Sequence, residues 1–136
     1  MSQENVEIVR RMAEVWNEAG WKGAADQGLF HPDVEYHDDR RWPEARSVVG
    51  TAALVERFEE IMDVLGKDAR ADVEELLDAG DDSVLMIFGF TGEARSSGIR
   101  HSYRWAFHCR VKELQITYIQ AYLDPEQALE AAGLRE

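Results

Sequence analysis

The spacing of apolar residues changes after residue 65 of this chain, and that change limits the folds available to it. Over residues 3–19 and 51–65 the apolar side chains recur at the spacing of amphipathic helices. From residue 69 to residue 123 apolar and polar side chains alternate, which is typical of strands. Helices that precede a run of strands favour an α+β fold and argue against a doubly wound parallel sheet.

The predicted elements follow from this spacing and from helix and turn signals. Helices are expected over 3–19, 21–29, 51–65 and from Pro125 onward, and strands over 30–38, 69–79, 83–94, 99–111 and 116–123. Ser2 is a candidate cap for the first helix, and Gly20 is its candidate end. Residues 39–50 are predicted as a loop, and Ser96-Ser97-Gly98 as a turn. Short turns between long strands imply an antiparallel sheet, whose concave face the helices would cover.

Length and charge restrict the class of protein. The 136 residues are 45% hydrophobic, which fits a single domain over residues 1–136 with its own core. The net charge of −12 makes nucleic acid and anionic membranes poor partners. The sequence has neither the long apolar run of a membrane span nor the basic and apolar start of a signal peptide, so we expect a cytoplasmic protein.

Metal and thiol chemistry find little support in the sequence. Cys109 is the single cysteine, so it can form neither an internal disulfide nor a cysteine-based zinc site. Its apolar neighbours favour a buried structural thiol. His31, His37, Asp38 and Asp39 match no common metal-ligand spacing. We therefore expect no metal and no cofactor.

Asp38 is the main candidate for chemistry. Side chains alternate along a strand, so Val34, Tyr36 and Asp38 would share one face, and two of these three favour burial. One interpretation makes Asp38 a general base at the rim of an apolar pocket. The other makes it a carboxylate that caps the Arg40–Arg41 loop, held by backbone N–H groups or by an arginine. The sequence leaves both open.

The order of elements resembles a known group of proteins. The resemblance is carried by residues 5–11, by residues 30–38 in the first strand, and by residues 50–54, 78–82 and 122–134. The chain is similar to the NTF2-like superfamily, and within it to the SnoaL-like relatives of polyketide cyclases and ketosteroid isomerases. This implies an NTF2-like (cystatin-like) cone, with a curved antiparallel sheet and three helices on the concave face. The fold hosts enzymes, binding proteins and scaffolds, so it does not specify a reaction.

The resemblance also implies a position for a catalytic base. Asp38 falls where ketosteroid isomerases keep theirs, and Tyr36 is a possible hydrogen-bond donor beside it. The positions of that group's two oxyanion donors correspond to Met12 and to Ala106 or its neighbour, and neither Met12 nor Ala106 can donate from its side chain. Steroid isomerisation is therefore not expected. Phe88-Gly89-Phe90 and Ala121 likewise replace the charged residues of this fold's epoxide hydrolases.

Large apolar side chains are the candidate ligand contacts. In a cone they would surround a small, largely apolar organic molecule. The candidates are Met12, Trp16, Phe58, Phe88, Trp105 and Phe107. Alternatively these side chains simply fill the core.

Two further expectations concern the surface. The loop from Asp39 to Val49, with Trp42 and three arginines, is either a lid that attracts an anionic ligand or an ordinary surface loop. Strands 83–91 and 99–111 carry apolar residues on more than one face, so we expect a homodimer through the outer face of the sheet. Three functional hypotheses remain open: a cofactor-free isomerase or cyclase, a ligand-binding or scaffold protein without chemistry, and a protein-interaction module.

Overall fold

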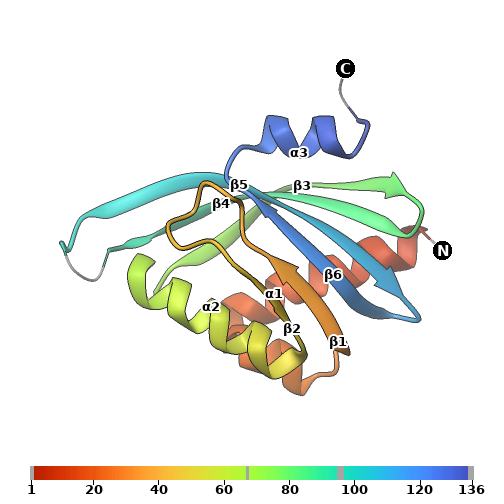
Figure 1. Ribbon diagram of the computed structural model, residues 1–136, viewed down its shortest axis with the longest axis horizontal. Helices are drawn as coiled ribbons and strands as arrows, with labels where there is room; N and C mark the ends of the chain where they lie inside the picture. The colour runs from red at the N-terminus through yellow and green to blue at the C-terminus, as the bar shows by residue number, and fades with distance from the viewer. Residues whose placement is uncertain (1, 67, 95–96, 135–136) are drawn as a thin grey trace.

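The computed structural model describes residues 2–66, 68–94 and 97–134. In chain order the elements are α1 (Ser2–Asp26), β1 (Phe30–His37), β2 (Ser47–Val49), α2 (Thr51–Leu65), β3 (Arg70–Gly80), β4 (Ser83–Glu93), β5 (Arg100–Lys112), β6 (Gln115–Tyr122) and α3 (Pro125–Ala131). Figure 1 shows their arrangement. The predicted cap side chain of Ser2 and the predicted turn residue Ser96 lie outside what the structure describes. The α+β class predicted from the sequence is confirmed.

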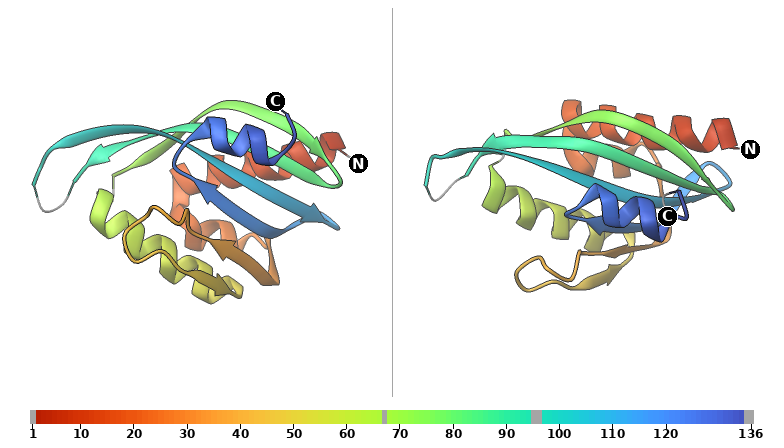
Figure 2. Two further views of the ribbon diagram at one scale, coloured as in Figure 1. Left: turned by 45° about the horizontal axis from the view of Figure 1, so that its top comes forward. Right: turned by 90° about the horizontal axis from the view of Figure 1, so that it is seen from above.

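The six strands form one curved, unclosed sheet in the order β2-β1-β6-β5-β4-β3. Successive long strands from β3 to β6 pair antiparallel through short turns, as predicted. The pairing of β1 with β6 is parallel, which corrects the expectation of an antiparallel sheet throughout. These two strands are far apart in the sequence, so no hairpin turn dictates their relative direction. The paired ends of β4 and β5 project beyond the other strands (Figure 2).

The chain bends sharply at Gly20, as its predicted role as a helix end requires. Gly20 has φ 75° and ψ 179°, a conformation that is essentially confined to glycine. The two predicted helices, 3–19 and 21–29, are therefore the two halves of α1. The second half is shorter than predicted, because α1 ends at Asp26.

A short edge strand lies within the segment that was predicted as a loop. β2 pairs antiparallel with β1 and places Val48 opposite Tyr36. Three residues are too few for an alternating pattern to be detectable, and two of the three are exposed. The prediction of a continuous loop over 39–50 is thus wrong for 47–49.

The main core lies between the concave face of the sheet and the two longer helices. Both halves of α1 contribute to it, and so does α2. The predicted three helical segments on this face are thus the two halves of α1 together with α2. Cys109 is fully buried in this core, and burial raises the pKa of its thiol to about 12, as befits the structural thiol predicted.

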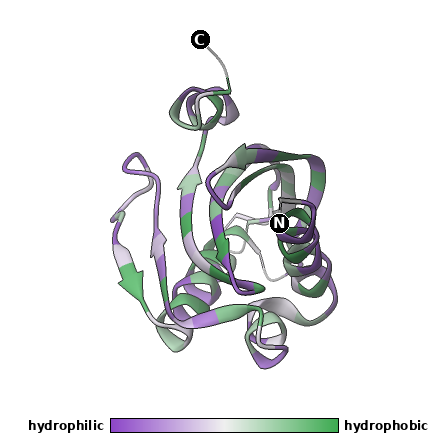
Figure 3. Ribbon diagram, turned by 90° about the vertical axis from the view of Figure 1, so that its right-hand side faces the viewer, coloured by the Kyte–Doolittle hydropathy of each residue, from purple (hydrophilic) through white to green (hydrophobic). Residues whose placement is uncertain are grey.

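Helix α3 packs on the opposite face of the sheet. Ala128 and Leu129 contact Leu85, Ile87 and Ala106, which form a second apolar cluster. Figure 3 shows α3 standing apart from the other two helices. Asp124 caps α3 by accepting a hydrogen bond from the Glu126 N–H at 3.0 Å, so the predicted helix start is confirmed.

This placement bears on the predicted homodimer. Part of the apolar outer face that motivated the dimer is covered by α3 within one chain. The dimer stays a prediction, and sedimentation at micromolar concentration tests it. A monomeric mass would contradict it.

Candidate functional site

Asp38 follows the last residue of β1 and faces the interior. Val34, Tyr36 and Asp38 are 0%, 1% and 6% exposed, so the shared buried face predicted from strand alternation is confirmed. Asp38 is thus far more buried than an aspartate at the start of a loop ordinarily is. What holds the Asp38 carboxylate there decides its chemistry.

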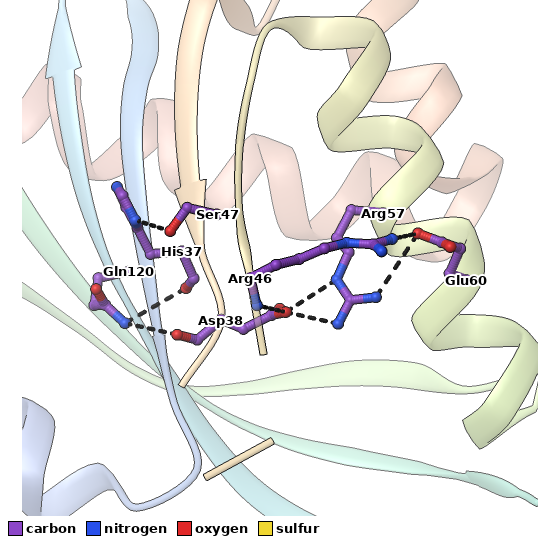
Figure 4. Close-up of polar contacts among 7 residues, drawn as sticks. All are labelled: His37, Asp38, Arg46, Ser47, Arg57, Glu60 and Gln120. Carbon is purple, nitrogen blue, oxygen red and sulfur yellow. Dashed lines mark hydrogen bonds and ion pairs between the residues drawn. The ribbon is translucent and has the colours of Figure 1, made fainter. Parts of the chain in front are cut away.

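A buried arginine from α2 pairs with this carboxylate. Arg57 donates from Nη2 at 2.6 Å and from Nε at 3.0 Å to Asp38 Oδ2, and the Arg46 backbone N–H donates to the same oxygen at 3.0 Å (Figure 4). The Asp38 side chain is 2% exposed and that of Arg57 is 8% exposed. The result is a desolvated, hydrogen-bonded ion pair that joins α2 to the end of β1.

The sequence prediction did not identify Arg57. A signal was present, however, because Arg57 lies three residues after Leu54 and four before Ile61 on the apolar stripe of α2. An arginine on a buried helix face needs a carboxylate partner. Asp38 was the carboxylate already predicted to face inward.

Tyr36 completes the buried cluster. Its hydroxyl lies beside the Asp38 carboxylate, and the pKa of the phenol is raised well above its ordinary value. Burial is the largest cause, followed by the negative charge of Asp38, while Arg57 acts in the opposite direction. The phenol is therefore held in its protonated, donating form.

The raised pKa of Tyr36 predicts a dependence of stability on pH. Because the pKa is higher in the folded state, this contribution is fully present below the unfolded value and is lost as the pH rises toward the folded pKa. The free energy of unfolding of Tyr36→Phe should fall less than that of the wild type between about pH 9 and about pH 11.5. Urea denaturation across that range measures the two slopes, and equal slopes would contradict the prediction.

The neighbouring Asp39 has the capping role that the sequence left open for Asp38. Its carboxylate accepts hydrogen bonds from the backbone N–H groups of Arg41 at 2.9 Å and of Leu123 at 2.8 Å. It also pairs with the Arg41 side chain at 3.0 Å. Burial opposes ionisation of Asp39, but these hydrogen bonds outweigh it and lower its pKa. Asp39 thus fixes the loop that follows β1.

The loop after Asp39 keeps two of its three arginines occupied. Arg41 pairs with Asp39, and Arg46 pairs with Glu60 on α2. Trp42 packs its ring against the edge of Trp105, with ring centroids 5.6 Å apart. The loop therefore lies over the apolar interior at Trp105. Because Arg41 and Arg46 are paired, Arg40 is the loop arginine that the hypothesis of an anion-attracting lid would have to use.

Most of the predicted ligand contacts pack against one another. Met12, Phe88 and Phe107 are 0% exposed. The ring of Phe107, for example, contacts four other aromatic rings. Its centroid lies 4.8 to 6.3 Å from those of Trp16, Trp21, Phe58 and Phe88. The fold thus brings most of the predicted ligand contacts together, but as a packed aromatic core.

An open groove of about 1130 Å³ lies beside this core, between α2 and the bend of α1 around Gly20. Arg70, Thr91 and Arg100 border it from β3, β4 and β5. Of the six predicted ligand contacts, Trp16 and Phe58 line the groove and the other four do not. The sequence did not predict this groove, since its position depends on the bend at Gly20.

Other kinds of site have less to support them. Within 2–66, 68–94 and 97–134, no group of three or more histidine, cysteine or acidic residues is arranged to hold a metal ion. None of the helices in the same described ranges is long and apolar enough to cross a membrane. The buried cluster and the groove are therefore the two features on which function can be argued.

Solved structures share this fold over almost their whole length. Bal32a, from a soil-derived mobile gene cassette, is 22% identical, with a TM-score of 0.76 and 89% of each chain covered. An NTF2-like protein from Burkholderia xenovorans LB400 is 24% identical, with a TM-score of 0.71 and 97% of each chain covered. A protein with the ketosteroid isomerase-like fold from Catenulispora acidiphila DSM 44928, solved with trimethylamine, is 19% identical, with a TM-score of 0.70 and coverage of 94% and 93%.

These identities are low enough that the likeness establishes the fold alone. A comparison with curated proteins finds no significant match. The sequence itself matches the model of the SnoaL-like domain over residues 9–119. That match includes β1, the buried arginine and most of the sheet, so the chain belongs to the SnoaL-like family.

Proposed function

We propose that this SnoaL-like protein binds a small organic molecule in the groove between α1 and α2, and that Asp38 acts as a structural anion. The observation that carries the proposal is the state of the Asp38 carboxylate. It is already bound by the Arg57 guanidinium and by the Arg46 backbone N–H, and Tyr36 lies beside it. A base must reach a substrate proton directly or through one water, and this carboxylate is 2% exposed.

The groove supplies what the packed interior lacks, namely open volume. Its volume slightly exceeds the usual range of small-molecule sites, and it is lined in part by Trp16, Trp21 and Phe58. The Catenulispora acidiphila relative, solved in complex with trimethylamine, supports small-molecule binding on this fold. A small, largely apolar ligand was also the prediction from sequence, although there it was placed among the core aromatics.

A second candidate function retains Asp38 as the general base of a cofactor-free isomerase or cyclase. The contact between Asp38 and the Tyr36 hydroxyl favours it, because a paired acid and base at one buried point is an arrangement that enolate chemistry uses. For this function Arg57 would have to release the carboxylate when substrate enters. A scaffold role without any ligand is the remaining alternative.

A groove-filling substitution tests the binding proposal. Ala19 lines the groove from α1 and is exposed, so Ala19→Trp fills the space with little effect on the core. Ligand-observed NMR with a set of neutral and charged aromatic fragments should find binders of the wild type that Ala19→Trp no longer binds. The matched control is Ala131→Trp on α3, on the other face of the sheet, which should bind them as the wild type does.

The role of Asp38 is tested separately with Asp38→Asn. We expect fragment binding in the groove to be unchanged and no turnover of carbonyl compounds to depend on Asp38. Turnover by the wild type that disappears in a folded Asp38→Asn protein would overturn the proposal in favour of the isomerase or cyclase. Loss of a fragment in both tryptophan variants would show that it binds elsewhere.

A further inference from the structure

The groove has a strongly unequal set of charges. Six carboxylates line it against three basic side chains. The acidic residues are Glu18, Glu56, Glu59, Glu60, Asp63 and Asp68, and the basic ones are Lys22, Arg70 and Arg100. Clefts lined by one sign of charge concentrate ions of the opposite sign. An excess of carboxylates therefore favours a cationic ligand and disfavours an anionic one.

Ion pairs occupy several of these charges. Lys22 pairs with Asp26 at 3.3 Å, Arg100 pairs with Asp68 at 3.8 Å, and Glu60 pairs with Arg46. Glu18 on α1 and Glu59 on α2 have no ion-pair partner in the described part of the chain. One carboxylate from each helix thus remains available to a ligand that enters between them.

Two tryptophans that line the groove each carry a buried, unsatisfied donor. The indole Nε1 atoms of Trp16 and Trp21 are buried and have no hydrogen-bond partner among the described residues. Both tryptophans line the groove, and each is 3% exposed. A buried donor without an acceptor is destabilising, so an oxygen atom placed beside it would be favoured. Asn17, between them, offers nothing similar, because its amide is bonded to the backbone of Ala71 at 2.7 and 2.9 Å.

We propose that the groove binds an organic cation that also carries a hydrogen-bond-accepting oxygen. The ammonium group would lie between Glu18 and Glu59, and the oxygen would accept from the indole N–H of Trp16 or Trp21 after a small shift of the wall. This inference rests on the proposed function, since it assigns a ligand class to the same groove. None of the arginines of the 39–46 loop lines the groove; Arg46 pairs with the groove residue Glu60, which leaves Glu18 and Glu59 as the carboxylates for the ammonium group.

Three probes separate the charge from the oxygen. Acetylcholine has both features, 3,3-dimethylbutyl acetate is its neutral isostere, and pentyltrimethylammonium has the charge without the oxygen. Titrations followed by two-dimensional NMR give the dissociation constant and report the indole N–H signals directly. Acetylcholine should bind about tenfold more tightly than the neutral ester at low salt, and the difference should shrink as the ionic strength rises. Pentyltrimethylammonium should bind while leaving the indole N–H signals in place.

A charge-matched pair of variants locates the effect. Glu18→Gln/Glu59→Gln should weaken acetylcholine severalfold and leave the neutral ester unchanged. Glu4→Gln/Glu130→Gln removes the same charge from exposed positions that do not line the groove, so it should bind both probes as the wild type does. Equal weakening in the two double variants would mean that only the net charge of the protein matters, and it would overturn the assignment.

The outcomes distinguish this inference from the proposed function. If the neutral ester binds as tightly as acetylcholine and Ala19→Trp blocks both, the groove is a ligand site but the cation assignment is wrong. If none of the three probes, nor any aromatic fragment, binds the wild type in a manner that Ala19→Trp abolishes, both are wrong. If acetylcholine binds without moving the Trp16 or Trp21 indole signals, the accepting oxygen is wrongly assigned.

Discussion

Replacing Arg57 with alanine should lower the free energy of unfolding by about 3–5 kcal/mol, because it strands the buried Asp38 carboxylate without its partner. The Arg57 guanidinium makes two hydrogen bonds to Asp38 Oδ2, and both side chains are nearly excluded from water. A buried charge that loses its partner must be transferred from water without compensation. Urea denaturation of the wild type and Arg57→Ala measures the loss.

The matched control is the exposed pair of Arg104 and Glu74. Its atoms are also 3.0 Å apart, but its side chains are 60% and 40% exposed. Arg104→Ala should therefore cost no more than about 1 kcal/mol. The double variant Arg57→Met/Asp38→Asn should recover part of the loss, since it removes both charges. A loss for Arg57→Ala as small as that of the control would contradict the buried ion pair.

This ion pair also connects the interior to the groove. Arg57 Nη1 lies 3.7 Å from Glu60 Oε1, and Glu60 lines the groove and pairs with Arg46. Arg46 in turn donates its backbone N–H to Asp38. The loop after β1, the helix α2 and the groove are thus held by one set of charges. Such a set suits a rigid binding scaffold better than a base that must exchange protons.

The sequence predicted the position of Asp38 but not its partner. Alternation along a strand is strict, so Tyr36 and Asp38 could be placed on the buried face from spacing alone. Arg57 was missed because a helix pattern is found from its apolar residues, and a single charged residue within the stripe does not disturb it. Which of Asp38 and Asp39 would cap the loop depended on the backbone N–H groups of Arg46 and Leu123, and Leu123 lies far along the chain from both.

Other features depend on tertiary geometry that the sequence carries only weakly. The parallel pairing of β1 with β6 joins strands with no turn between them, and β2 is too short for its alternation to register. The bend at Gly20 was predicted as a helix end. The groove that this bend opens beside α2 could not be predicted, because it exists only when both helices are packed on the sheet.

Phe107→Ala should lower the free energy of unfolding by about 3–5 kcal/mol, because the interior of the cone is filled by its own aromatic side chains. Phe107 is 0% exposed and contacts four other aromatic rings, so truncation leaves a cavity that these rings can refill only in part. Thermal or urea unfolding measures the loss. Val64→Ala on the exposed side of α2, at 60% exposure, is the control and should change stability by about 0.5 kcal/mol or less.

The size of this loss separates the two interpretations of the aromatic residues. A side chain that lines a ligand cavity already lacks neighbours on one side, and its removal forfeits fewer contacts. A loss below about 1.5 kcal/mol for Phe107→Ala would therefore place the ligand site inside the cone, where the sequence first suggested it. A loss in the expected range, together with binding of an apolar molecule such as benzene to Phe107→Ala but not to the wild type, would establish that the interior is packed. The groove between α1 and α2 would then stand as the open site for the ligand binding proposed above.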